Sequence, residues 1–257
     1  MQHAQTPQLA QLRATITRLE RSHTPANAPA PLPFGLPPID DALPGGGLPL
    51  GALHEVAGQA ADLEHGAAAA LFAAGILARI GGPVLWVLEH HDLFAPGLAA
   101  AGLHPDRVVY AEAGRKDALL VMEEGLRQRG LAGVVAEVSG RVTLTASRRL
   151  QLAAEATGVT ALLLRRPKSG GTELAGAVAA VTRWRIGTLP SPPPIPHAPD
   201  VPGLGWPRWQ LDLLRCRGGR TGSWITEACD ATGHLRLVAP LADRPAAAHP
   251  RHRRTAA

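Results

Sequence analysis

Lysine is nearly absent from this sequence of 257 residues. Only two of its 26 basic residues are lysines, Lys116 and Lys168, and the remaining 24 are arginines. The formal net charge is +5 and the sequence pI is about 10.2, a balance that is compatible with a nucleic acid or an acidic partner. A GC-rich coding sequence also favours arginine together with alanine, glycine and proline, so composition leaves both origins of the arginine excess open.

Cysteine is scarce as well. Two cysteines, Cys216 and Cys229, are too few for a disulfide framework or a cysteine metal site, which indicates free thiols in a reducing compartment. His90, His91 and Asp92 resemble metal ligands by composition, but adjacent residues on an extended segment point to opposite faces and cannot all reach one ion. We therefore predict polar loop residues there and no metal site.

Long apolar runs are missing too. The first 20 residues contain no continuous apolar stretch, which argues against a signal peptide. No uninterrupted run of about 18 apolar residues is present to span a bilayer. Hydrophobic residues still make up 46% of the chain, enough to build a core. We expect a soluble, cytoplasmic protein.

Four segments are predicted from changes in composition along the chain. Residues 1–23 place apolar side chains at helical spacing and predict an N-terminal helix, which either packs on its own domain or docks a partner. Residues 24–33 predict a proline-rich linker, because proline is excluded from helix and sheet interiors. Residues 34–240 are predicted to form the core domain, and residues 241–257 a basic, disordered tail.

Short apolar runs alternate with helical segments through most of this core. The alternation predicts an α/β fold with a mostly parallel sheet covered by helices on both faces. Beyond residue 168 the pattern becomes strand-rich and predicts an antiparallel extension, interrupted at residues 191–205 by a proline-rich excursion that cannot belong to the core. The predicted strands are 52–57, 83–88, 107–110, 133–138, 159–164, 179–187, 206–217, 222–229 and 234–238, and the predicted helices are 64–80, 93–101, 116–129 and 145–157.

Residues 34–66 combine a turn-rich segment, a short buried strand, a glycine turn and the start of a helix. A strand, a loop and a helix in this order form the phosphate-binding loop of many nucleotide-binding proteins. Such a loop requires G-x-x-x-x-G-K-[ST], whose lysine contacts the phosphates and whose hydroxyl binds magnesium. The loop after this strand has neither residue, and it places acids where the phosphates would lie. The degenerate positions are Gly58, Gln59, Asp62, Glu64 and Gly66.

Three stretches of the sequence resemble a known fold. They are FGLPPIDDALPGGGLPLGALHEVAG at 34–58, VLWVLEHHDLFAPGLAAAGLHPDRVVYAEA at 84–113 and GVVAEVS at 133–139. These stretches resemble the RecA core, and more closely the ImuA family of RecA-like proteins of damage-inducible mutagenesis. The resemblance covers residues 34–240 and implies a RecA-like P-loop NTPase core. An intact RecA opening segment joined to a degenerate phosphate loop is a fairly specific combination.

Two acidic positions of the RecA pattern fall on Glu89 and Glu137. The resemblance places a catalytic glutamate at Glu89, at the end of a buried strand, and a magnesium-coordinating acid at Glu137, where a Glu is one methylene longer than the usual Asp. Without the lysine and the hydroxyl, a triphosphate loses charge-assisted contacts worth about 1.5–3 kcal/mol each. We interpret both acids as relics, and we expect no catalysis and no bound ATP or magnesium.

Arg165, Arg166 and Lys168 follow a predicted strand, at the point where RecA-like proteins carry DNA-facing loops. The resemblance makes these residues candidates for contact with a phosphate backbone, and a solvated loop is the alternative. Tryptophans and arginines alternate further along the chain, which suits stacking on single-stranded DNA and suits core tryptophans with solvated arginines better. The tryptophans are Trp184, Trp206 and Trp209, and the arginines are Arg183, Arg185 and Arg208.

Taken with the resemblance, these features predict a non-catalytic accessory protein of error-prone translesion DNA synthesis in the SOS response. The implied partners are ImuB, which is a Y-family-like polymerase subunit, an error-prone DNA polymerase and RecA. Two other functions stay open from the residues alone. One is a divergent DNA-dependent ATPase that uses Glu89 and Glu137, and the other is a single-stranded DNA-binding module.

Overall fold

The computed structural model describes residues 29–167, 176–195, 197–198 and 200–238. The predicted N-terminal helix, the predicted tail and Lys168 lie outside these residues. None of the helices within them is both long and apolar enough to cross a bilayer.

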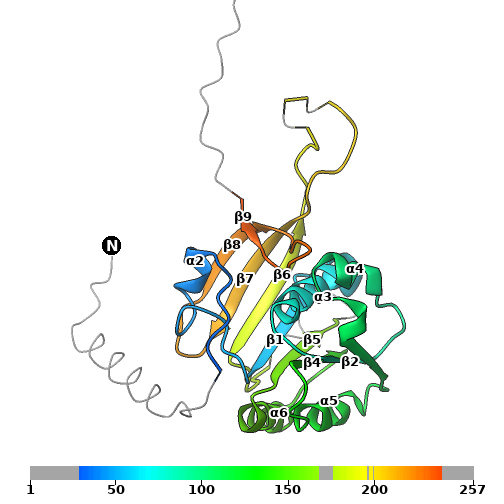
Figure 1. Cartoon of the computed structure of the whole chain (residues 1–257), viewed down its shortest axis with the longest axis vertical. Coiled ribbons are helices and arrows are strands. Elements are labelled where there is room, and N and C mark those ends of the chain that lie inside the picture. The colour runs from blue at the N-terminus through cyan, green and yellow to red at the C-terminus, as the bar shows by residue number, and fades with distance from the viewer. Residues whose placement is uncertain (1–28, 168–175, 196, 199, 239–257) are drawn as a thin grey trace, which may run out of the picture.

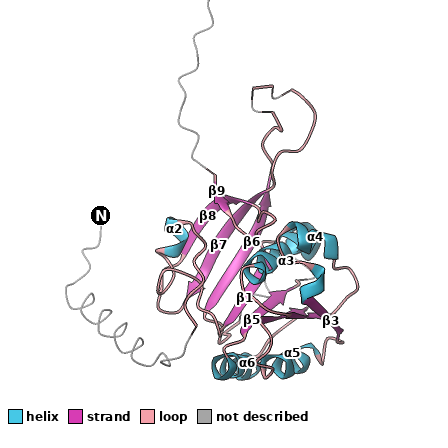
Figure 2. Cartoon of the chain, viewed as in Figure 1, coloured by secondary structure: helices cyan, strands magenta, loops and turns pink. Residues whose placement is uncertain are grey.

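One sheet organises the described part of the chain (Figure 2). Its strand order is β3-β2-β4-β5-β1-β6-β7-β8-β9. The strands are β1 (Leu53–Gly58), β2 (Val84–Leu88), β3 (Val108–Glu112), β4 (Gly133–Val138), β5 (Thr160–Arg165), β6 (Thr182–Leu189), β7 (Arg208–Cys216), β8 (Gly222–Glu227) and β9 (Arg236–Leu237).

The strands from β3 to β6 in this order run parallel to one another. β1 lies in the middle, where Val56 is opposite Leu164 of β5 on one side and Trp184 of β6 on the other. Every residue of β1, β4 and β5 is buried, as expected of parallel strands covered on both faces. The remaining strands, β7, β8 and β9, continue the sheet in antiparallel pairing. The predicted α/β fold with an antiparallel extension is confirmed.

Helices cover both faces of the parallel strands (Figure 1). On β1, Val56 packs in a core shared with α3, whereas Leu53 packs in a second core with residues of α5 and α6. The two positions point to opposite faces because side chains alternate along a strand. The helices are α2 (Pro37–Asp40), α3 (Asp62–Ala78), α4 (Ala95–Ala100), α5 (Ala118–Leu126) and α6 (Leu144–Thr157), with a 3₁₀ turn η1 (Pro105–Arg107) before β3.

The turn-rich segment 34–48 covers the antiparallel part of the sheet, beside β7 and β8 in Figure 1. The carboxylate of Asp40 accepts hydrogen bonds from the backbone N–H groups of Phe34, Gly35 and Leu36 at 2.6–3.0 Å. These bonds satisfy three donors that would otherwise lie free at the start of α2. The segment therefore has an architectural role: it closes the core beneath β6 and β7.

Trp184 of β6 is the aromatic centre of this core. Its ring centroid lies 5.6 Å from that of Phe34, 5.4 Å from that of Phe72 and 6.4 Å from that of Trp224. The indole N–H donates to Thr182 at 2.9 Å. Trp184 and Trp209 are buried, so two of the three predicted core tryptophans are confirmed as core residues, whereas Trp206 is exposed.

We predict that Trp184→Ala lowers the free energy of unfolding by about 3–5 kcal/mol, because it removes a buried ring and leaves a cavity. Urea unfolding followed by circular dichroism measures this change. Trp206→Ala is the matched control: its side chain is 51% exposed, and the expected loss is under about 1 kcal/mol. Equal losses in the two variants would contradict the packing described for Trp184.

Candidate functional site

The carboxyl ends of the parallel strands meet along one edge of the sheet, where ligands bind in open α/β folds. Four strands contribute polar residues to this edge. β1 leads into residues 59–61, the loop that the sequence predicts to be a degenerate phosphate loop, β2 into residues 89–92, β4 into Ser139, and β5 into Arg166. Because β4, β5 and β1 are neighbours in the sheet, segments that lie about a hundred residues apart in the chain come together.

The loop between β1 and α3 has three residues and is closed by contacts within the protein. The N–H of Gln59 donates to the carbonyl of Ile186 at 2.8 Å, and that of Asp62 donates to the carbonyl of Pro167 at 3.2 Å. His65 accepts from the N–H of Thr188 at 3.1 Å. In a phosphate-binding loop, backbone N–H groups point at the phosphates. Here two of these donors are already used by backbone carbonyls.

Gly58 and Gly66 leave no spare room in this loop. A Cβ on Gly58 would lie 2.9 Å from the Cβ of His65, and a Cβ on Gly66 would lie 2.3 Å from Oδ1 of Asp62. Side chains of α3 therefore pack directly against the two glycines. The side chain of Glu64 is 67% exposed and points its charge into solvent.

Arg166 is the centre of the site. Its Nε and Nη2 donate to Asp62 at 3.0 and 2.7 Å, and its Nη1 and Nη2 donate to Asp92 at 2.7 and 2.6 Å. Nη1 also donates to Glu137 at 2.8 Å. A guanidinium has five N–H donors, and these five bonds use them all. The side chain is only 17% exposed, so the guanidinium is held inside the protein.

The charges of the site do not balance, because three carboxylates surround one guanidinium. Hydrogen bonds to the carboxylates, the one to Asp92 above all, raise the pKa of Arg166. The hydrogen bond from Arg166 in turn lowers the pKa of Asp92. Burial raises the pKa of Glu137, against the opposing hydrogen bonds from Trp86 and Arg166. Arg166 therefore offsets part of the negative charge that Asp62, Asp92 and Glu137 bring to this edge.

Glu89 has a different partner. Its carboxylate accepts a hydrogen bond from the N–H of Ser139 at 2.6 Å and another from the hydroxyl of the same residue. These bonds tie the loop after β2 to the loop after β4. The carboxylate at the predicted catalytic position is thus engaged in a structural contact.

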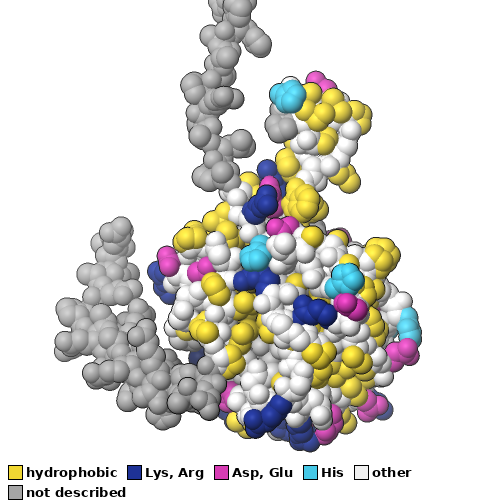
Figure 3. Space-filling model, in the orientation of Figure 1, with side chains coloured by type: hydrophobic (Ala, Val, Ile, Leu, Met, Phe, Trp, Pro, Cys, Tyr) yellow, Lys and Arg dark blue, Asp and Glu magenta, His cyan; other side chains and the backbone are white. Residues whose placement is uncertain are grey.

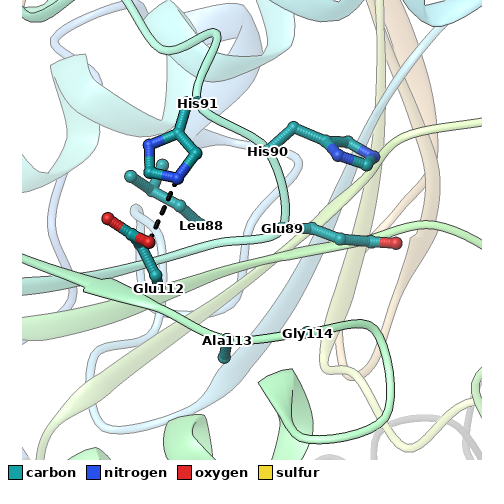
Figure 4. Close-up of a pocket in the computed structure, with 7 residues that line it drawn as sticks. All are labelled: Leu88, Glu89, His90, His91, Glu112, Ala113 and Gly114. Atoms are coloured by element: carbon teal, nitrogen blue, oxygen red, sulfur yellow. Dashed lines mark ion pairs between the residues drawn. The ribbon is translucent and has the colours of Figure 1, made fainter.

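A cavity of about 190 Å³ lies beside Glu89 at the ends of β2 and β3. Figure 4 shows His91 directed toward Glu112, with Glu89 and His90 directed away from that pair. His91 and Glu112 form an ion pair at 3.1 Å between two exposed side chains. The polar groups around this cavity do not converge on one point. In the described ranges, no group of three or more His, Cys, Asp or Glu side chains is arranged to hold a metal ion.

A second ion cluster lies within the sheet. Glu55 of β1 is fully buried, and its carboxylate accepts from Arg165 at 3.1 Å and from Arg183 at 2.5 Å. Arg165 is 2% exposed and also donates to the carbonyl of Gly140. This corrects the prediction that Arg165 contacts a DNA backbone, because its guanidinium is enclosed by the protein.

Similarity to known proteins assigns this chain to a family. The sequence is 45% identical over 231 residues to Protein ImuA of Caulobacter vibrioides, in strain NA1000 / CB15N and equally in strain ATCC 19089 / CIP 103742 / CB 15. The match covers 84% of this chain and 92% of the relative. The chain belongs to the ImuA family. No protein-family model matches it.

Membership of the ImuA family confirms the family expected from the sequence. The site itself joins some of the predicted residues and separates others. Asp62, Glu137 and Arg166 come together in one cluster, whereas Glu89 is bound to Ser139. In this ImuA-family chain, the residues at the phosphate position do not fit a magnesium-bound triphosphate, because an arginine with no free donor lies beside an acidic loop.

The sequence did not predict the contacts of three residues of the site. Asp92 lies in a loop, as predicted, but its two hydrogen bonds from Arg166 were not foreseen. Glu55 lies in an apolar run, and a charge inside such a run is the signal for a buried ion pair. Ser139 carried no signal, because its partnership with Glu89 depends on the position of β4 beside β2.

We predict that Arg166→Met lowers the free energy of unfolding by about 3 kcal/mol, because it leaves partly buried carboxylates without their cation. Equilibrium urea unfolding measures the loss. Arg148→Met is the control, since Arg148 lies exposed on α6, and it should change stability by less than about 0.5 kcal/mol. Adding Glu137→Gln to Arg166→Met should recover part of the loss. A change in Arg166→Met no larger than that in Arg148→Met would refute the central role of this guanidinium.

The same variant has an expected pH dependence. Arg166 lowers the pKa of Asp92. The ionised carboxylate therefore stabilises the native protein above the pKa that Asp92 has in the unfolded chain, and this stabilisation is lost as the pH falls through the lower pKa of the folded protein. Without Arg166, the clustered carboxylates repel one another, and protonation relieves the repulsion. The stability gap between wild type and Arg166→Met should therefore narrow as the pH is lowered from about 7 to about 3, with the part due to Asp92 lost below the ordinary pKa of 3.8. A gap that stays constant in urea titrations across this range would argue against the charge cluster as its cause.

Proposed function

We propose that this chain is a non-catalytic accessory protein of error-prone translesion DNA synthesis in the response to DNA damage. It acts in the cytoplasm as an adaptor, and it neither binds nor hydrolyses ATP for this role. Its partners are an ImuB-type polymerase subunit without catalytic residues, an error-prone DNA polymerase and RecA. Membership of the ImuA family supports the biological setting.

The hydrogen bonding of Arg166 is the observation that carries the non-catalytic part of this proposal. Phosphoryl transfer relies on cations that approach the phosphates and neutralise developing charge. Here the cation is an arginine whose five donors bind Asp62, Asp92 and Glu137. Releasing it toward a phosphate would leave three carboxylates unpaired beside a polyanion. This internal ion cluster supports the proposal that the edge does not bind a nucleotide and its magnesium.

The DNA-binding alternative has little support at the residues first suggested for it. Arg165 is buried against Glu55, Arg166 is surrounded by carboxylates, and Trp184 and Trp209 lie in the core. Stacking on single-stranded DNA needs exposed aromatic rings beside free cations. We therefore assign recognition of partners to protein surfaces, with the segments 1–23 and 241–257 as further contact sequences.

We predict that the purified chain binds the ImuB-type subunit with the same dissociation constant in the presence and absence of ATP and magnesium. Titration calorimetry measures that constant, and a separate titration with ATP and magnesium should give no binding heat. The physical reason is that Arg166 has no donor left for a phosphate.

A P-loop ATPase that binds ATP under the same conditions serves as the positive control. Tight binding of ATP and magnesium that is lost in Glu89→Gln or Glu137→Ala would overturn the non-catalytic proposal. Failure of the chain to bind the ImuB-type subunit would overturn the adaptor proposal.

A further inference from the structure

A long arm interrupts an otherwise simple hairpin between β6 and β7. The pairing of these strands begins at Leu189 opposite Arg208 and continues to Thr182 opposite Cys216. Two antiparallel strands can be joined by a two-residue turn. The chain instead inserts residues 190–207, here called the proline arm, whose described residues (190–195, 197–198 and 200–207) extend away from the body of the protein (Figure 1). Connections of this length without regular structure are uncommon and are usually functional or disordered. A two-residue turn would be enough to join β6 and β7, so we look for a function of the arm outside the sheet.

The proline arm is stiffened by its composition and by contacts at its base. Eight of its 18 residues are prolines, and proline fixes φ and favours extended conformations. The N–H of Gly205 donates to the carbonyl of Pro192 at 3.1 Å, which joins the two limbs of the arm. The indole N–H of Trp206 donates to the carbonyl of Ala228 at 3.2 Å, which ties the arm to the segment after β8. Residues held at the base of the arm in this way lose less conformational entropy when they bind a partner.

Large apolar side chains of the arm point into solvent. The exposed fractions are 89% for Leu204, 51% for Trp206 and 42% for Val201. Figure 3 shows hydrophobic atoms gathered on the arm where it stands clear of the body. Exposed tryptophan on a stiff loop is typical of residues that dominate the energy of protein interfaces. Such surface is costly to leave in water unless a partner covers it.

The charges of the arm indicate whether the partner that covers it is a nucleic acid or a protein. The chain has 26 lysines and arginines, yet none lies between residues 190 and 207, where Asp200 is the one acidic residue. Binding to a phosphate backbone depends on such cations. A proline-rich, apolar segment suits an aromatic-lined groove on another protein.

We propose that the proline arm is the docking element for the polymerase-like subunit, and that an apolar groove on that subunit receives Leu204 and Trp206. This inference rests on the proposed adaptor function. The arm follows the carboxyl end of β6, so it leaves the sheet at the same edge as the Arg166 cluster. It therefore presents its apolar side chains beside the edge where related folds bind ligands.

The test compares three variants of the full chain in calorimetric titrations with the purified ImuB-type subunit. Leu204→Ser should weaken binding at least tenfold. Replacement of residues 190–207 by Asn-Gly, a sequence suited to a two-residue turn, should weaken it at least a hundredfold. Leu152→Ser is the matched control, because Leu152 is exposed on α6 and should bind as wild type does. Circular dichroism and thermal unfolding confirm that each variant folds.

The outcomes separate this inference from the adaptor function. If wild type binds the subunit and both arm variants bind equally well, the docking role of the arm is wrong and the adaptor function stands. If wild type does not bind the subunit at all, both are wrong. If light scattering shows wild type to be a dimer that Leu204→Ser converts to a monomer, the arm joins two copies of this chain and the inference also fails. Selective loss in the arm variants supports it.

Discussion

The guanidinium of Arg166 holds together the carboxyl edge of the sheet. It joins the ends of four strands, because Asp62 follows β1, Asp92 follows β2, Glu137 lies in β4 and Arg166 itself follows β5. These acids would repel one another without a cation, and burial already raises the pKa of Glu137. A partly buried ion cluster is weak evidence for added stability, because desolvation opposes attraction. Its effect is instead one of position: it sets where each loop lies.

Much of the fold could be predicted from the sequence because parallel strands are buried on both faces and appear as apolar runs. The predicted bounds of β4 (Gly133–Val138) are those of the structure, and β1 (Leu53–Gly58) differs by one residue at each end. The bounds of segments with less burial were harder to predict. The predicted helix 93–101 is the shorter α4, and the predicted strand 234–238 reduces to β9.

The candidate site could be predicted in its residue types but not in its pairings. Asp62, Glu137 and Arg166 were each named, yet their contact depends on the strand order β4-β5-β1, which local patterns do not encode. The same limit explains Arg165. Successive side chains at a strand end point to opposite faces, so one arginine turns toward Glu55 and the next toward Asp62. Sequence alone does not show which of the two lies inside.

An internal cation at the phosphate position changes what the fold can offer a partner. In nucleotide-dependent folds, loops at the carboxyl edge respond to the bound phosphates, and their geometry follows the ligand. Here Arg166 joins the loops of this edge from within the chain, and under the proposed function their arrangement does not depend on a nucleotide. The proline arm leaves from this edge and is itself stiffened by prolines and by its bond to Ala228. If the arm is the docking element proposed above, holding both the edge and the arm in place before binding adds affinity through preorganisation, which suits the proposed adaptor.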